Sequence, residues 1–220
     1  MRLRNIPAAR PAVEASPICI QDPVSLMGAW KSQPWNPGSD GASAPLHIEI
    51  GMGKGHFITE MARRNPDIAY LGIERYESVM YKALLRMGDE EPSNLRFLCE
   101  DAGNMPTFFK PGEIDRIYLN FSDPWPKARH DKRRLTHHRF LQIYADLLPV
   151  EGLIEFKTDN EALFDFSIEE IEAFPDFDLI KTTRDLHHDD DMNPGNVMTE
   201  YEAKFSALGN PIYKLIAKRR

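Results

Sequence analysis

The sequence contains only two cysteines in 220 residues, Cys19 and Cys99. They lie far apart and have no histidine partners at metal-ligand spacing, which excludes a disulfide framework and a zinc site and is typical of the reducing cytoplasm. No apolar run approaches the roughly 18 residues that a membrane-spanning helix needs, which excludes a membrane protein. The arginines near the N-terminus have no apolar stretch behind them, so we expect no secretory signal there.

The overall composition is that of an ordinary globular protein. Apolar residues make up 42% and charged residues 28%, which excludes disordered and fibrous classes. Domains typically hold about 100–200 residues, so the length fits one domain with additions. The net charge is −7, from 27 basic and 34 acidic side chains. An acidic protein of this kind would not bind nucleic acid if its charge were evenly spread.

Positive charge is concentrated in the segment from Lys127 to Arg139. Its thirteen residues hold six Lys or Arg and one acid, Asp131, so it carries +5 and leaves −12 for the rest of the chain. A solvated face is the usual explanation of a charge run. Here no glutamate at helical spacing compensates the run, which starts directly after the unusual tetrapeptide Asp123-Pro124-Trp125-Pro126. Such a strip on an acidic protein indicates a polyanion held at one place.

From Leu46 onward, short apolar runs alternate with amphipathic stretches. Strands are predicted at residues 46–50, 69–73, 95–99, 114–119, 153–156, 177–182 and 212–217. Helices are predicted at 57–64, 78–87 and 161–173, and around a face formed by Phe140, Ile143, Tyr144 and Leu147. This alternation predicts a Rossmann-like α/β domain over residues 46–220, with a mostly parallel sheet covered on both faces. Residues 1–45, rich in Pro, Gly and Ser, are predicted to form a loosely structured N-terminal arm with a short helix near 25–31.

The first predicted strand ends in Glu49-Ile50-Gly51-Met52-Gly53-Lys54-Gly55. The glycines let the backbone turn sharply and approach a ligand closely. A dinucleotide fingerprint would need its third glycine at position 56, which is His56, and a phosphate-binding P-loop is absent. The pattern E-x-G-x-G-x-G instead resembles the first motif of S-adenosylmethionine-dependent methyltransferases. That cofactor carries a sulfonium and an ammonium and no phosphate, so carboxylates near it are favourable.

Acids also follow the next two predicted strands. Glu74 ends the second, about 20 residues past the glycines, where an acid binds ribose hydroxyls in Rossmann-like folds. The third leads to Asp101-Ala102, where an acid can accept from an adenine amino group. A single acid after a strand is more often a helix cap or turn former. Three acids, each after its own strand, favour a cofactor pocket.

The fourth predicted strand leads into the most distinctive motif of the chain. It reads Asn120-Phe121-Ser122-Asp123-Pro124-Trp125-Pro126-Lys127, followed by Arg129-His130 and Lys132-Arg133-Arg134. This string strongly resembles the bacterial tRNA (guanine-N7-)-methyltransferases. Further matches are Gly72-Ile73-Glu74, Phe156-Lys157-Thr158-Asp159 and Thr199-Glu200-Tyr201-Glu202 with Lys204-Phe205. The likeness runs from about Leu46 to the C-terminus, and Met1-Arg2-Leu3-Arg4 is similar to Gram-positive members, which makes a homodimer plausible.

The resemblance implies a class I methyltransferase that moves a methyl group from S-adenosyl-L-methionine to N7 of guanosine in tRNA, at position 46 of the variable loop. It implies a cofactor pocket made by Glu49, Gly51, Gly53, Gly55, Glu74, Asp101, Ala102 and Asp123, the last also being the active-site residue. The implied substrate contacts are Lys127, Asp159, Thr199, Glu200, Tyr201 and Glu202. The implied RNA-binding segment is Arg129, His130, Asp131, Lys132, Arg133 and Arg134. No metal is implied.

The chemistry fits this interpretation independently. N7 of guanine has a free lone pair and no proton to remove, so catalysis can depend on alignment and charge alone. A carboxylate such as Asp123 can stabilise positive charge that develops on the base. Asp159 or Glu202 can accept from the guanine N1–H and amino group, which selects guanine over adenine. Trp125 either stacks on the base or packs the loop.

Two alternatives remain open. One is another methyltransferase, acting on an adenine amino group or on a protein; the adenine enzymes place two adjacent prolines before the aromatic residue, whereas Trp125 separates them here. The other is a non-catalytic RNA-binding protein, which would be expected to lose Glu49, the glycines or Asp123. The stretch His187-His188-Asp189-Asp190-Asp191 looks like a ligand set, but its polar surroundings favour a solvated loop.

Overall fold

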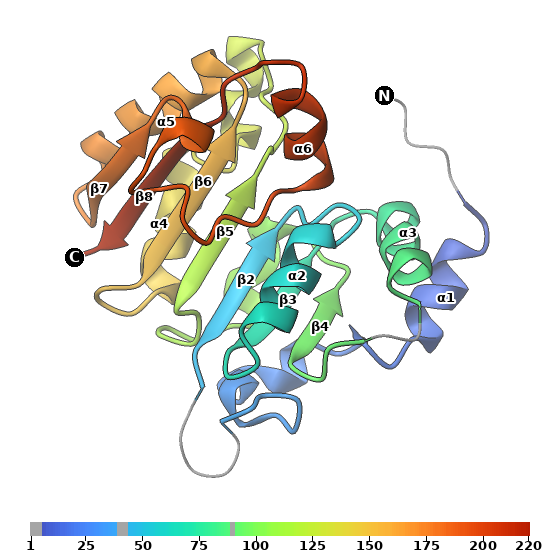
Figure 1. The fold of residues 1–220 in the computed structure, drawn as a ribbon. Coiled ribbons are helices and arrows are strands. Elements are labelled where there is room, and N and C mark those ends of the chain that lie inside the picture. The colour runs from blue at the N-terminus through green and yellow to red at the C-terminus, as the bar shows by residue number, and fades with distance from the viewer. Residues whose placement is uncertain (1–5, 39–43, 89–90) are drawn as a thin grey trace.

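The computed structural model describes residues 6–38, 44–88 and 91–220, and in this part of the chain it shows one eight-stranded sheet (Figure 1). The strand order is β1-β4-β3-β2-β5-β6-β8-β7, and only β8 runs antiparallel to its neighbours. The strands are β1 Cys19–Ile20, β2 Leu46–Ile50, β3 Ala69–Ile73, β4 Leu95–Leu98, β5 Arg116–Asn120, β6 Leu153–Thr158, β7 Phe177–Thr183 and β8 Tyr213–Arg219. The predicted mostly parallel α/β sheet is confirmed.

Helices cover both faces of this sheet. The α-helices are α1 Ala9–Ala15, α2 His56–Arg64, α3 Glu77–Met87, α4 His138–Leu147, α5 Glu161–Ala173 and α6 Glu200–Ser206. Figure 1 shows α2 and α3 on one face and α4 and α5 on the other. Every residue of β2 and β3 is buried, including His47 and Glu49, the two polar residues of β2. Burial on both faces is expected for the inner strands of a sheet that helices cover on both sides. No helix in the described part of the chain is long and apolar enough to cross a membrane.

The sheet has one point where the order of its strands reverses. From β2 the chain proceeds through β3 to β4 in one direction, and then returns to place β5 and β6 on the other side of β2. The carboxyl ends of β2 and β5, at Ile50 and Asn120, therefore lie side by side in parallel register. In open α/β sheets this switch point is where ligands bind.

The segment before β2 is more ordered than predicted. β1 pairs in parallel with β4, and α1 packs beside α3 (Figure 1). Trp30 is fully buried, and its indole Nε1 donates to the carbonyl of Phe108 at 2.6 Å. The prediction of a loosely structured arm is therefore wrong for residues 6–38, because apolar anchors such as Trp30 hold a Pro- and Gly-rich stretch against the core. The short helix expected near 25–31 is replaced by two 3-10 turns, Val24–Leu26 and Trp30–Ser32. The match of residues 1–4 to Gram-positive members lies outside the described residues.

Candidate active site

A pocket of about 610 Å³ opens at the carboxyl ends of β2, β3, β4 and β5. Five of the eight predicted cofactor residues line it, namely Gly51, Glu74, Asp101, Ala102 and Asp123. The cations Lys132, Arg133 and Arg139 also line it. Segments far apart in the sequence thus meet at the switch point, where acids from the strand ends and cations from the basic segment share one pocket.

Glu74 joins the end of β3 to the glycine turn. One carboxylate oxygen accepts from the backbone N–H of Gly53 at 3.1 Å, and the other accepts from that of Tyr76 at 3.0 Å. The side chain is buried, and burial together with the nearby Asp123 carboxylate raises its pKa, although the backbone hydrogen bonds oppose this. Gly51 and Gly53 have φ angles of +75° and +58°, which only glycine adopts without strain.

Gly55 has a packing role. It precedes α2 with a φ of +72°, and a Cβ atom at this position would come within 3.2 Å of the Phe97 ring. It lines neither this pocket nor the neighbouring one described below. The structure therefore places Gly55 behind the site, where it allows α2 to start close to β4.

Asp101 is both a helix cap and a pocket residue. Its carboxylate caps a 3-10 helix, Ala102–Thr107, by accepting from the N–H of Gly103 at 2.8 Å, and it also faces the pocket. The second oxygen lies 3.4 Å from the guanidinium of Arg75. The sequence interpretation missed Arg75, although it stands directly after Glu74 in a strand-end motif.

The loop that follows β5 carries Asp123 on an unusual backbone. Phe121 and Trp125 have φ angles of +50° and +42°, a left-handed conformation that residues other than glycine seldom adopt. Such strain is concentrated at functional sites. Asp123 is exposed on the pocket wall, and in the described chain it makes no hydrogen bond or ion pair. Its carboxylate is therefore available to a ligand.

Trp125 packs within its own loop region. The guanidinium of Arg133 lies 4.7 Å from its ring centroid, and the His130 ring meets it edge-on at 5.8 Å. The indole also lines the large pocket. Packing of the loop is therefore observed, and stacking on a base stays a prediction.

A second pocket of about 200 Å³ lies between the glycine turn and α6. Gly51 and Phe121 line both pockets, so the two adjoin at this point. Its other side is formed by Thr199, Glu200 and Tyr201, whose phenol donates to the Asp159 carboxylate at 3.1 Å. The structure thus brings four of the six predicted substrate residues to this place. Lys127, a fifth, lines neither pocket.

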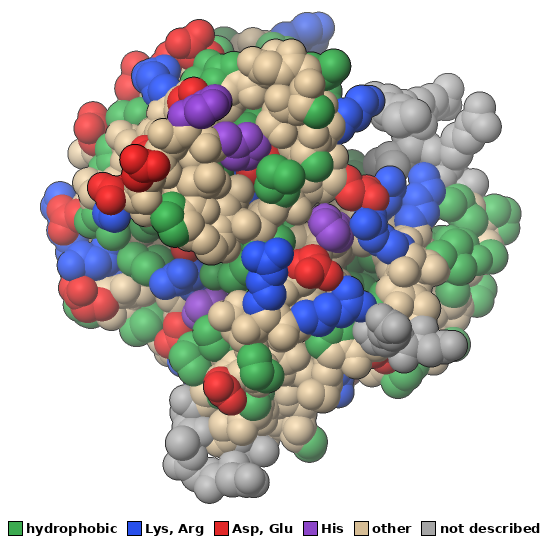
Figure 2. Space-filling view, in the orientation of Figure 1, with side chains coloured by type: hydrophobic (Ala, Val, Ile, Leu, Met, Phe, Trp, Pro, Cys, Tyr) green, Lys and Arg blue, Asp and Glu red, His purple; other side chains and the backbone are tan. Residues whose placement is uncertain are grey.

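Charged side chains from the glycine turn, α3 and α6 meet beside this pocket. Figure 2 shows acidic and basic side chains side by side on this face of the molecule. Glu200 pairs with Lys54 of the glycine turn at 3.0 Å and with Arg86 of α3. The ion pairs are exposed and individually weak, so α6 is joined to the glycine turn by contacts that a ligand can reorganise.

Glu202, the sixth predicted substrate residue, lies in the interior. Its carboxylate accepts from Lys157 at 2.7 Å, from Asn196 at 2.8 Å and from the N–H of Thr199, and it also bonds to His187. Burial alone would raise its pKa, but Lys157, His187 and Asn196 outweigh burial and lower it. These contacts indicate that Glu202 holds the start of α6 against β6, and they correct the expectation that it faces guanine.

Glu49 lies at the floor of the small pocket. It is buried, and one oxygen accepts from the Asn120 amide at 2.8 Å. The other oxygen has no hydrogen-bond partner in the described part of the chain. Burial raises the pKa of Glu49 to about 8. An acid buried in this way is suited to a ligand that brings its own positive charge.

The raised pKa of Glu49 gives a pH-dependent effect on stability. Between the usual glutamate pKa of 4.5 and the folded value of about 8, the folded protein retains a proton that the unfolded chain has lost. The stability that this proton contributes is therefore complete below pH 4.5 and is lost as the pH rises toward 8. We expect Glu49→Gln to remove this decline. The free energy of unfolding of the variant should therefore rise relative to that of the wild type as the pH increases. Urea unfolding at pH 5, 6.5 and 8 measures the free energy of unfolding of both proteins. The same pH dependence in the variant and the wild type would contradict the prediction. Glu172→Gln, at an exposed site on α5, is the matched control.

The first half of the basic segment forms a short 3-10 helix, Ala128–Arg133. Arg129 and Lys132 are exposed, and their side chains make no hydrogen bond or ion pair with a described residue. The Asp131 carboxylate accepts from the N–H of Lys132 at 2.6 Å and so belongs to the helix itself. Arg134 is half-buried and bonds to the loop of Asp123. The segment that the resemblance assigns to RNA thus also contributes Lys132 and Arg133 to the pocket lining.

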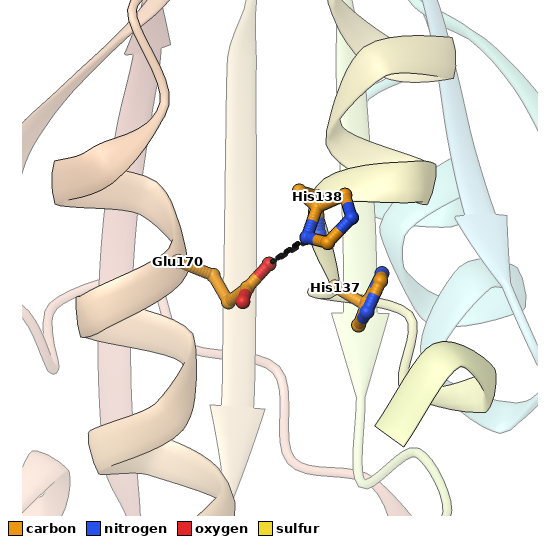
Figure 3. Close-up of side chains that lie close together, drawn as sticks. All are labelled: His137, His138 and Glu170. Carbon is orange, nitrogen blue, oxygen red and sulfur yellow. Dashed lines mark hydrogen bonds and ion pairs between the residues drawn. The ribbon is translucent and has the colours of Figure 1, made fainter. Parts of the chain in front are cut away.

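Two histidines and a glutamate lie together at the start of α4 (Figure 3). His138 bonds to Glu170 at 3.2 Å, while Nδ1 of His137 accepts from the N–H of Arg139 and caps the helix. These hydrogen bonds already use atoms that a metal ion would need. The arrangement is explained by capping α4 and joining it to α5. The separate stretch 187–191 also bonds locally, with His188 paired to Asp185.

Solved structures with low sequence identity share this architecture. TrmN from Thermus thermophilus is 19% identical with a TM-score of 0.55, over 84% of this chain and 47% of that one. The 16S rRNA methyltransferase KamB is 12% identical with a TM-score of 0.58, over 80% and 87%. The fold is that of the class I methyltransferases.

Sequence relatives define the family more narrowly. A family model described as "Putative methyltransferase" matches residues 43–215. The tRNA (guanine-N(7)-)-methyltransferase of Lachnoclostridium phytofermentans is 48% identical over 219 residues, 100% of this chain and 99% of the relative. That of Bacillus subtilis is 45% identical over 217 residues, 97% of each. The chain belongs to the family of bacterial tRNA (guanine-N(7)-)-methyltransferases.

Proposed function

We propose that this protein transfers a methyl group from S-adenosyl-L-methionine to N7 of a guanosine in tRNA. The observation that carries the proposal is the gathering of four carboxylates, those of Glu49, Glu74, Asp101 and Asp123, at the switch point of a methyltransferase fold. The relatives named for this reaction cover the whole chain. A tRNA substrate would place the enzyme in the cytoplasm. Two further points stay predictions: the boundary at residue 46 between the N-terminal arm and the methyltransferase domain, and the formation of a homodimer.

The two pockets fit a cationic cofactor without phosphate. In this proposal the unpaired oxygen of Glu49 accepts from the ammonium group, and Glu74 accepts from the ribose hydroxyls. Asp101, which follows β4 and lines the large pocket, accepts from the amino group of adenine in this proposal. When bound, the cofactor supplies an electrophilic methyl group on a positively charged sulfur.

Asp123 has an electrostatic role in this proposal. Guanine N7 has no proton to lose, and the base gains positive charge as the methyl group arrives. A carboxylate exposed on the pocket wall can hold the base and stabilise that charge. The small pocket beside it offers Tyr201 and Phe121, whose ring centroids lie 5.1 Å apart, as an aromatic wall for the base. Asp159, which accepts from the Tyr201 phenol beside this pocket, is the proposed acceptor for the N1–H and amino group that distinguish guanine.

Position 46 of the variable loop is the proposed target. A transcript that carries 7-deazaguanosine at this one position retains every Watson–Crick pairing group but lacks N7. We expect it to accept no methyl group, whereas the same substitution at another loop guanosine leaves transfer unchanged. Equal transfer to both transcripts would place the target elsewhere.

The free cations of the basic segment are expected to bind phosphates. We assume that Arg129 and Lys132 each contact one phosphate. The double variant Arg129→Ala with Lys132→Ala should then reduce the magnitude of the slope of log affinity against log salt by roughly 1.4, at about 0.7 per contact. Arg133 and Arg134 are left unchanged because they contact the loop. Filter binding of tRNA from low to moderate salt measures the slope. If these two side chains are only solvated, the double variant will have the wild-type slope. That outcome would show that this segment is not part of the RNA interface.

A further inference from the structure

Arg134 differs from the other cations of its segment in what its guanidinium contacts. Nε donates to the carbonyl of Pro124 at 3.1 Å, and Nη2 donates to the carbonyl of Trp125 at 3.2 Å. The flat face of the group lies 4.3 Å from the ring centroid of Phe166. Both the edge and the face of this guanidinium are therefore engaged by the protein itself.

The loop that Arg134 holds has few other attachments. Pro124 and Pro126 have no N–H to donate. In the described part of the chain, residues 122–126 make no hydrogen bonds other than these two. The loop nevertheless carries left-handed backbone at Trp125, and such conformations persist only where the surroundings determine them. The Trp125 ring also contacts Arg133 and His130, and the two bonds from Arg134 hold the loop backbone itself.

The other end of this connection is rigid. Phe166 belongs to α5, whose inner face buries Leu163, Phe164 and Ile171 against the sheet. The guanidinium, lying on the Phe166 ring, thus links a well-packed helix to the loop that presents Asp123. An ammonium group would keep the charge of Arg134 but not the planar fork that reaches two carbonyls at once.

We propose that Arg134 is a positioning residue for Asp123 and not a phosphate ligand. This inference rests on the proposed function, since it concerns the loop that carries Asp123. It divides the basic segment in two: Arg129 and Lys132 bind RNA, whereas Arg134 fixes the geometry in which the base meets the methyl group. Loss of Arg134 therefore acts on the rate of transfer, and loss of Arg129 acts on affinity for tRNA and its salt dependence.

The test compares Arg134→Lys with Arg129→Ala. Single-turnover methyl transfer is measured at saturating tRNA and cofactor, and the tRNA salt slope by filter binding. For Arg134→Lys we expect a rate about 10–100-fold lower, the order of loss that misplacement by about 1 Å causes, with the wild-type salt slope. For Arg129→Ala we expect a slope lower by about 0.7. In Arg134→Ala, added guanidinium ion at a non-denaturing concentration is expected to restore part of the rate.

Arg184→Lys is the matched control, because its guanidinium also lies over a ring of α5, 5.3 Å from the ring centroid of Phe164, but donates to Glu161 and Asp165 instead of the loop. We expect the wild-type rate for it. A wild-type rate for Arg134→Lys, or a salt slope reduced as in Arg129→Ala, would overturn the inference. If Arg134→Ala does not fold, the variants Arg134→Lys and Phe166→Leu test the inference instead. We expect Phe166→Leu to slow methyl transfer without changing the salt slope of tRNA binding. An inactive wild-type enzyme would instead overturn the proposed function, and the inference with it.

Discussion

Replacing Asp123 with alanine is expected to lower the rate of methyl transfer by about 10²–10³-fold, the order of loss when one preorganised electrostatic group is removed. The fold should be unaffected, because the side chain is exposed and makes no hydrogen bond or ion pair in the described chain. Asp123 raises the pKa of Glu74, so its loss is also expected to lower that pKa. Cofactor affinity should be largely retained, since Glu49, Glu74 and Asp101 remain.

Single-turnover rates at saturating tRNA and cofactor measure this effect, with cofactor affinity determined by calorimetry. Asp123→Asn separates charge from shape, and we expect it to lose most of the rate because the amide keeps the size but not the negative charge. Asp146→Asn, at an exposed site on α4, serves as the control. A rate for Asp123→Ala near that of the wild type would remove Asp123 from the reaction.

Breaking the buried ion pair between Lys157 and Glu202 is expected to cost about 3–5 kcal/mol of folding free energy, because the remaining charge is left without its partner in the interior. Their side chains are 4% and 0% exposed. The Lys157 ammonium also donates to Asn196 and to the carbonyl of Val197, so the pair joins β6 to the loop before α6. Lys157→Met should therefore also weaken the placement of Tyr201 beside Asp159.

Urea unfolding of Lys157→Met, Glu202→Leu and the double variant measures this effect. We expect the double variant to lose less than the sum of the single losses, since it leaves no unpaired charge. Because the pKa of Glu202 is lowered, the contribution of the pair is complete above the usual value of 4.5 and is lost as the pH falls through the lowered value. Lys218→Met, which breaks the exposed pair with Glu151, is expected to cost at most about 1 kcal/mol. Strictly additive losses, or single losses as small as this control, would show that the pair is not a coupled buried unit.

The strand-end acids could be predicted from the sequence because each depends on a local pattern. A short apolar run predicts a strand, and parallel strands bring their carboxyl ends to one edge, so Glu74 and Asp101 meet there without further information. The glycine turn before α2 was also evident, because left-handed backbone requires glycine at Gly51 and Gly53. Family resemblance added the loop of Asp123.

Other features depend on contacts between distant residues and could not be predicted in this way. Glu202 and Tyr201 are neighbours in one motif, yet α6 turns one toward the buried Lys157 and the other toward Asp159. Arg134 looks like its neighbours in a basic run until Phe166 and the loop carbonyls are placed beside it. The burial of Trp30 likewise depends on a partner, Phe108, that lies far along the chain.

The central claim is that this protein methylates guanine N7 in tRNA. Its most direct test incubates the wild-type protein with an unmodified tRNA transcript and S-adenosyl-L-methionine labelled in its methyl group, followed by complete digestion to nucleosides and separation by chromatography with mass detection. We expect all transferred label in 7-methylguanosine, in an amount approaching one per tRNA. Label in a methylated adenosine, or binding of both cofactor and tRNA without any transfer, would contradict the account.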